Sequence, residues 1–220
     1  MSIKNKFDIY SISNKQAKPW ILKKHYAKRM PSISYAFGLY KNKEIVGVCT
    51  FGFPPNYTFN DGDCVFENYS VKTLELNRLI TEDDLPKNAL SYFVSHALDK
   101  LPKPTCIVSY ADANKGHHGY IYQATNWIYT GVSTPKHRYH FEDGTTFDIR
   151  RGIDKKKKQH GKIVKKEKLK PTHRYFYFNG NKRDKRKMEK EFKFDIKPYP
   201  KGDNEKYDTG DKVVKQQRLF

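Results

Sequence analysis

Residues 105–131 read TCIVSYADANKGHHGYIYQATNWIYTG, and this stretch decides the fold. Its short apolar run, Cys106–Val108, follows two prolines and predicts a buried strand. Polarity returns at Asp112, and open α/β sheets bind ligands at the carboxyl ends of their strands. A glycine-flanked turn and a short helix over 120–125 come next, and Asn126 can end that helix in a left-handed conformation before a new strand.

This order of elements resembles the second half of the GNAT acyltransferase fold. In that family a helix that ends in Tyr-x-x-x-Gly-Phe leads into the next strand, and the matching residues here are Tyr122, Asn126 and Trp127. Asn tolerates a positive φ and Trp keeps an aromatic anchor, so both changes preserve the local geometry. The resemblance implies an α/β fold of the α+β type. Its mixed, mostly antiparallel central sheet is splayed between two strands and flanked by helices.

Three short patterns in this stretch are more specific. The Ser-aromatic-x-Asp end of the strand (109–112), Gly-His-x-Gly (116–119) and Tyr-Gln-Ala-x-Asn (122–126) resemble the Mom-type phage DNA-modification proteins. These GNAT-like enzymes place a carbamoylmethyl group on adenine N6 in DNA and so block restriction. The resemblance covers roughly residues 18–131. It implies a DNA-modifying transferase that uses acetyl-CoA or a related activated acyl donor, and the choice of donor stays open because a carbamoylmethyl group is not an acetyl group.

The charge of the chain is large and unevenly placed. Its formal net charge is +19, and the segment from Arg151 onward holds 24 Lys and Arg against 10 Asp and Glu. Such an asymmetry predicts that the C-terminal part meets a polyanion. Aromatic residues interleaved with the charge favour a nucleic acid over a merely solvated basic tail, and the resemblance implies that this partner is double-stranded DNA.

Composition also bears on location. No apolar run approaches 18 residues and the N-terminus has no signal-peptide pattern, so we expect no membrane contact. The three cysteines show no Cys-x-x-Cys spacing, which favours a reducing, cytoplasmic compartment. The sequence says nothing about the oligomeric state.

We expect four parts along the chain. The fold should be complete near Arg150, with 138–150 supplying closing strands, and the Lys runs that follow should have no fixed structure alone. An aromatic strand beyond them should dock back on the domain or on DNA. The parts are a GNAT-like catalytic domain (1–150), a Lys-rich linker (151–170), a basic aromatic extension (171–200) and a disordered tail (201–220).

Four residues are catalytic candidates. We expect Asp112 to orient or deprotonate the exocyclic amine of a flipped adenine, with a helix cap as the alternative. Tyr122 matches the tyrosine that GNAT enzymes use as a general acid, with a core tyrosine as the alternative. The alternation in 73–80 places Glu75 and Asn77 on one face and Arg78 on the other, and the resemblance implies that Glu75 and Asn77 point toward the acceptor. The alternative is that both are interior polar groups satisfied by backbone.

Cofactor binding is expected at the start of the helix 88–101. Free N–H groups and the helix dipole there favour a phosphate, with Lys87, Asn88 and Ser91 beside it. The GNAT pattern Arg/Gln-x-x-Gly-x-Gly/Ala is absent, which puts ordinary acetyl-CoA binding in doubt. The resemblance also assigns Asn126 to the cofactor side.

Substrate contacts are predicted from three places. The helix 15–28 ends in a polar cluster that either compensates the helix dipole or faces the acceptor. Tyrosines of the aromatic extension could stack on a base. Adjacent histidines in the 116–119 turn point in different directions and lack a clear third ligand, so we predict no metal site, although a metal is not excluded. The predicted substrate-binding residues are His25, Tyr26, Arg29, Tyr110, His117, His118, Tyr175 and Tyr177.

Two other functions remain open at this point. One is a GNAT-like acetyltransferase that acts on tRNA or protein. The other is a non-catalytic nucleic-acid-binding protein that has kept the fold.

Overall fold

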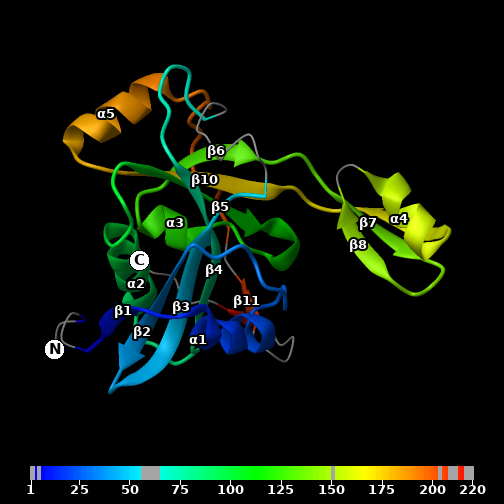
Figure 1. Cartoon of the computed structure of the whole chain (residues 1–220), viewed down its shortest axis with the longest axis horizontal. Coiled ribbons are helices and arrows are strands. Elements are labelled where there is room, and N and C mark those ends of the chain that lie inside the picture. The colour runs from blue at the N-terminus through cyan, green and yellow to red at the C-terminus, as the bar shows by residue number, and fades with distance from the viewer. Residues whose placement is uncertain are drawn as a thin grey trace.

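A seven-stranded sheet forms the body of the protein (Figure 1). The structure, a computed structural model, describes residues 3, 6–55, 65–149 and 152–202, and the backbone of 205–207 and 213–215. β4 and β5 pair in parallel and the other neighbours pair antiparallel, so the predicted mixed, mostly antiparallel sheet is confirmed. The strand order is β1 (Asp8–Ser11), β2 (Tyr35–Lys41), β3 (Glu44–Gly52), β4 (Thr73–Thr81), β5 (Thr105–Asp112), β10 (Thr172–Asn179) and β6 (Ile128–Val132).

Helices cover both faces of this sheet. On one face α2 (Ala89–Asp99) and α3 (Tyr120–Ala124) pack on the largest core cluster. On the other face, α5 (Lys182–Glu191) covers β5 and β10 through Met188, and α1 (Asn14–Pro19) with the π-helical turn η2 (Trp20–Lys24) covers β3 and β4. Strand residues alternate between these clusters, as the period of a β-strand requires.

β10 is a central strand, which corrects the predicted boundaries. It lies between β5 and β6, so the sheet is not complete near Arg150 and residues 171–200 are not an extension that docks on a finished domain. Tyr175 belongs to the cluster under α2 and Phe176 to the cluster under α5. A strand that is apolar on both faces needs a covered, central position.

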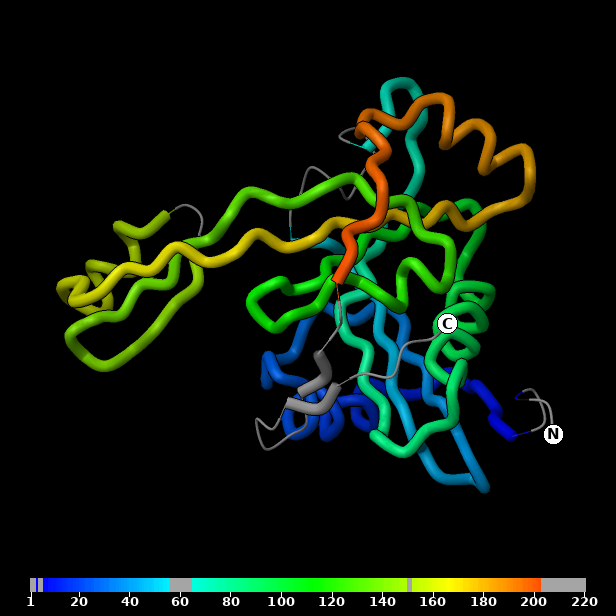
Figure 2. The backbone as a smooth tube through the Cα atoms, turned by 180° about the vertical axis from the view of Figure 1, so that it is seen from behind, coloured from blue at the N-terminus to red at the C-terminus, as the bar shows by residue number. Residues whose placement is uncertain are grey.

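Residues 137–168 form a separate arm (Figures 1 and 2). A three-stranded sheet in the order β8 (Thr146–Ile149), β7 (His137–Phe141) and β9 (Ile163–Lys168) carries α4 (Ile153–His160). The strands of 138–150 therefore do not close the main sheet, and most of 151–170 is a helix and a strand rather than an unstructured linker. Lysines suit β9 because it is an edge strand with outward-facing side chains.

The first helix starts and ends differently from the prediction. Ser13 is the N-cap, with a capping box to Gln16. The α-helix passes into the π-turn after Pro19, whose missing N–H interrupts the hydrogen-bond ladder, and the turn ends at Lys24 rather than near Lys28.

The C-terminal tail contains one short pair of strands. β11 (Glu205–Tyr207) pairs with β12 (Val213–Lys215), which differs from the disordered tail predicted for 201–220, and the rest of that tail beyond Gly202 lies outside the described residues. Cys49 and Cys106 are buried free thiols, and Cys64 lies outside the described residues. No helix in the described part of the chain is long and apolar enough to cross a membrane.

Candidate active site

The central feature of the site is a gap between two neighbouring strands. β4 and β5 pair only where Thr73–Glu75 faces Cys106–Val108, and then they part. This is the predicted splay. A cleft of about 1900 Å³ opens there, between the sheet and the arm. It brings together nine of the predicted residues, which are His25, Tyr26, Arg29, Glu75, Asn77, Tyr110, Asp112, His117 and Tyr122.

A β-bulge at Asn77 shapes one wall of the cleft. In the register with β3, Arg78 pairs with Thr50 while Leu76 pairs with Phe51, so Asn77 is the extra residue. Leu76 packs in the cluster under α2, and Ile80 packs in the cluster on the opposite face. Alternation back from Ile80 therefore places Arg78 on the face of Glu75, and the prediction that they lie on opposite faces is wrong.

The side chain of Asn77 holds this bulge in place. Its Oδ1 accepts a hydrogen bond from Thr50 Oγ1 at 2.6 Å, and its Nδ2 donates to the Ser32 carbonyl at 2.7 Å. Asn77 thus lines the cleft but uses its amide on the protein itself. The arrangement matches the alternative of a satisfied interior group, rather than a catalytic role.

Glu75 and Arg78 are poorly solvated groups on this wall. Burial raises the pKa of the Glu75 carboxyl to about 7, and the positive charges of Arg78, Lys136 and Arg29 offset part of that rise. The Arg78 guanidinium donates through Nη1 to the Asn77 carbonyl at 2.5 Å and through Nη2 to the Arg29 carbonyl at 2.9 Å. Glu75 Oε2 and Arg78 Nε are buried and have no hydrogen-bond partner among the described residues.

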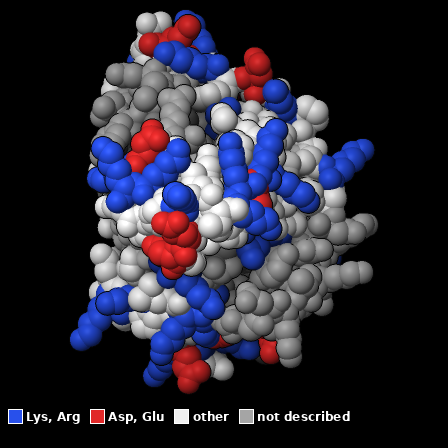
Figure 3. Space-filling view, turned by 90° about the vertical axis from the view of Figure 1, so that its right-hand side faces the viewer, with Lys and Arg blue, Asp and Glu red and all other residues white. Residues whose placement is uncertain are grey.

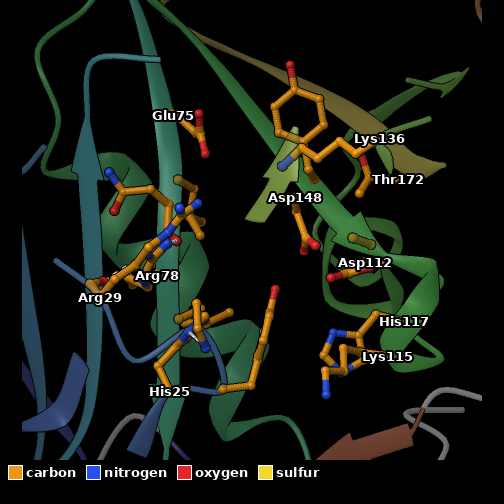
Figure 4. A pocket seen from close by; sticks show the side chains of 18 of the residues that line it. His25, Arg29, Glu75, Arg78, Asp112, Lys115, His117, Lys136, Asp148 and Thr172 are labelled. Atoms are coloured by element: carbon orange, nitrogen blue, oxygen red, sulfur yellow. Dashed lines mark hydrogen bonds between the residues drawn. The ribbon is translucent and has the colours of Figure 1, made fainter. Parts of the chain in front are cut away.

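Asp112 lies on the opposite wall with His117 and Lys115 (Figure 4). Its Oδ1 accepts hydrogen bonds from the backbone N–H and the side-chain amide of Asn114, both at 2.9 Å. Asn114 also donates to the Lys170 carbonyl at 3.0 Å, which ties this turn to the end of the arm. Asp112 therefore caps the short 3₁₀ turn Ala113–Lys115, which confirms the cap, and it also lines the cleft, where its catalytic role stays a prediction.

Tyr122 reaches the cleft from α3. Ser109 Oγ lies 2.7 Å from the Tyr122 hydroxyl and 2.8 Å from the Leu76 carbonyl. Ser109 has one hydroxyl hydrogen, so all groups are satisfied when Tyr122 donates to Ser109 and Ser109 donates to the carbonyl. Burial raises the pKa of the Tyr122 phenol well above its ordinary value, and the hydroxyl stays protonated.

His25 and Tyr26 form the end of the cleft nearest η2. Their rings stack with centroids 4.3 Å apart, and Tyr26 meets the His117 ring edge-on at 5.9 Å. Burial lowers the pKa of the His25 imidazole to about 3, and Nδ1 accepts the Ala27 N–H at 3.0 Å, so this ring is neutral. Tyr26 exposes 40% of its surface and offers an aromatic face.

Several predicted residues do not line the cleft. Tyr175 is fully buried, and its hydroxyl donates to the His118 carbonyl, so it cannot stack on a base. Tyr177 packs on Trp127 under α2. Asn126 has the predicted left-handed conformation (φ 59°) and ends α3 on the surface, which is a structural role. His118 lies outside the lining, with its ring 5.5 Å from that of His173.

The start of α2 differs from a phosphate site. Lys87, Asn88 and Ser91 are not part of the cleft lining, and Ser91 Oγ donates to the Asn88 carbonyl. Glu82 and Asp83 line the cleft at this end instead, and Glu82 forms an ion pair with Lys24. The missing GNAT glycine pattern before α2 was the feature of the sequence that pointed to this difference.

The sequence analysis missed a third wall of the cleft, which belongs to the arm. Arg138 and Asp148 face the cleft and form a bidentate ion pair, at 2.8 and 3.0 Å. The segment 136–170 holds 13 Lys and Arg against 5 Asp and Glu, and Lys and Arg are prominent on this side of the molecule (Figure 3). The charge of this segment was visible in the sequence, but its fold and position were not. Among the described residues, no group of three or more His, Cys, Asp or Glu side chains could hold a metal ion.

Comparison with known proteins agrees with the resemblance stated above. Residues 6–201 match the model of the Mom protein family. The chain is 30% identical over 205 residues to the methylcarbamoylase mom of Escherichia phage Mu, covering 88% of this chain and 83% of that protein. Among solved structures, a GNAT-family acetyltransferase from Bacillus cereus is 13% identical, with a TM-score of 0.42 over 79% of this chain and 97% of its own. A probable acetyltransferase from Staphylococcus epidermidis is 11% identical, with a TM-score of 0.42 over 78% and 98%. From the match over residues 6–201 and the identity to the phage Mu protein, we conclude that this chain belongs to the Mom protein family.

Proposed function

We propose that this chain is a transferase that places a carbamoylmethyl group on adenine N6 in double-stranded DNA and so protects the DNA from restriction. The cleft between the splayed strands is the observation that supports this most directly. It joins Asp112, Glu75 and Tyr26 from distant parts of the chain and has a basic arm as its third wall. Its volume of about 1900 Å³ exceeds the roughly 300–1,000 Å³ of a typical small-ligand pocket, so it has room for a flipped nucleotide.

Each group has a task in this proposal. The exposed face of Tyr26 holds the flipped adenine by stacking. Asp112 accepts a hydrogen bond from the exocyclic amine and takes its proton, because a delocalised amine is a weak nucleophile. Lysines and arginines of the arm bind the phosphates of the duplex.

The gap between β4 and β5 is where we expect the donor of the transferred group to bind. Beyond Glu75, β4 has no backbone pairing with β5 among the described residues; Ser109 occupies the Leu76 carbonyl, and we propose that the edge past Leu76 accepts a thin, extended chain. The start of α2 lacks the GNAT glycine pattern, and Lys87, Asn88 and Ser91 do not line the cleft, so it is a poor fit for the diphosphate of an acyl-CoA. Because the new bond to N6 is made at the methylene carbon, we propose an activated donor that carries the carbamoylmethyl group on a leaving group, and the bond from that carbon to the leaving group breaks as the N–C bond forms.

The test is mass spectrometry of nucleosides from DNA of cells that express the full chain. We expect a modified deoxyadenosine with the wild type. Asp112→Asn keeps an acceptor for the Asn114 N–H but removes the carboxylate, so its yield should fall by about 100-fold or more. Asp99→Asn, on the exposed end of α2, is the matched control and should retain the yield. Unmodified nucleosides with a folded wild-type protein would contradict the proposal.

A further inference from the structure

Two buried groups on the β4 wall have no hydrogen-bond partner, and they are complementary. Glu75 Oε2 is an acceptor, and Arg78 Nε–H is a donor. Both residues line the cleft, and the bulge at Asn77 places them on the same face of the strand. A buried polar group without a partner costs free energy, so a pair of them facing one cleft calls for an explanation.

The two groups are not partners of each other. No Glu75–Arg78 ion pair within 4.0 Å occurs among the described residues, although each charge affects the pKa of the other. The Arg78 guanidinium is held by the carbonyls of Asn77 and Arg29, so Nε–H keeps a fixed direction without a ligand. Both side chains project from β4, across the cleft from Asp112 and His117 (Figure 4).

We propose that Glu75 and Arg78 form a subsite for a primary carboxamide, the end of the group that is transferred. A carboxamide presents an N–H donor and a carbonyl acceptor side by side. The N–H donates to Glu75 Oε2, and Arg78 Nε–H donates to the carbonyl oxygen. An acetyl group has no N–H and would leave Glu75 unpaired, so the pair selects a carboxamide over a plain acyl group. The inference rests on the proposed function, because it assigns the subsite to that reaction.

The alternative role for Glu75 is that of a general base, and substitutions separate the two. Glu75→Gln keeps a side-chain oxygen that accepts an amide N–H but cannot accept a proton. Glu75→Leu removes the acceptor altogether. The carboxamide subsite therefore predicts that the Gln variant still discriminates between amides and that the Leu variant does not.

The test uses acetamide as the probe and the full chain labelled with ¹⁵N. The Nε–H signal of Arg78 is assigned by its loss in Arg78→Lys and is followed during titration. We expect acetamide to shift this signal saturably and N,N-dimethylacetamide, which keeps the carbonyl but lacks an N–H, to bind about tenfold more weakly. Glu75→Gln should preserve this difference and Glu75→Leu should abolish it.

Equal responses to the two amides, or no response of the Arg78 signal in the wild type, would overturn the subsite. This wild-type comparison stands by itself if the Leu variant does not fold. The result is independent of the nucleoside analysis. Modified deoxyadenosine without amide discrimination refutes the subsite alone, whereas amide discrimination with unmodified DNA refutes the proposed function.

Discussion

Replacing Glu75 by Gln should stabilise the protein in a way that depends on pH. Burial raises the pKa of Glu75 to about 7, above the ordinary value of 4.5, so ionising this carboxyl costs more in the folded protein than in the unfolded chain. The penalty is absent well below pH 4.5, grows as the pH rises toward 7, and is constant above 7. From the difference between the two pKa values, it amounts to about 3 kcal/mol at pH 8 and less than about 1 kcal/mol at pH 5.

Urea denaturation of the wild type and Glu75→Gln at both pH values measures this penalty. The gain in unfolding free energy from the substitution should be about 2–3 kcal/mol larger at pH 8 than at pH 5. Glu44→Gln, at an exposed position at the start of β3, is the control and should show no comparable dependence. A gain that is equal at pH 5 and pH 8 would refute the assignment of a raised pKa to Glu75.

Three more predictions test the walls of the cleft. Gly119 has a φ of 79°, and a Cβ there would lie 2.3 Å from the Tyr175 ring, so Gly119→Ala should lower the unfolding free energy by more than about 2 kcal/mol. Gly144→Ala, at a φ of 78° with open space around it, is the control and should cost only about 1 kcal/mol; equal losses for the two variants would contradict the packing of Gly119 against Tyr175. Replacing Lys136 and Lys156 by Gln should reduce the slope of log binding constant against log salt concentration for duplex DNA by about two. A double lysine substitution in the β2–β3 turn is the control and should leave the slope unchanged, and an unchanged slope for the Lys136 and Lys156 variant would show that these lysines do not contact phosphates. Tyr122→Phe removes the hydrogen bond between the Tyr122 hydroxyl and Ser109, and it should lower the unfolding free energy measured by urea denaturation by about 1 kcal/mol. The yield of modified nucleoside should also fall, and a full yield would exclude Tyr122 from the reaction.

Much of the local structure was predictable, because short-range rules determine it. The apolar run before Asp112 is a buried strand, and Asn126 takes the left-handed conformation that ends α3. The grouping of Asp112, Tyr122 and Glu75 in one cleft was predictable through the family pattern.

The tertiary structure alone decided the rest. β10 completes the sheet from beyond the Lys-rich segment, and periodicity cannot show which distant strands pair. That segment, read by itself as a linker, is held in place by pairing with β7. Arg78 reaches the face of Glu75 because the register with β3 skips Asn77, and a single extra residue reverses the alternation that a strand sequence predicts. The candidates for the chemistry could therefore be named from local patterns and the family resemblance, while contacts between distant segments govern which of them meet.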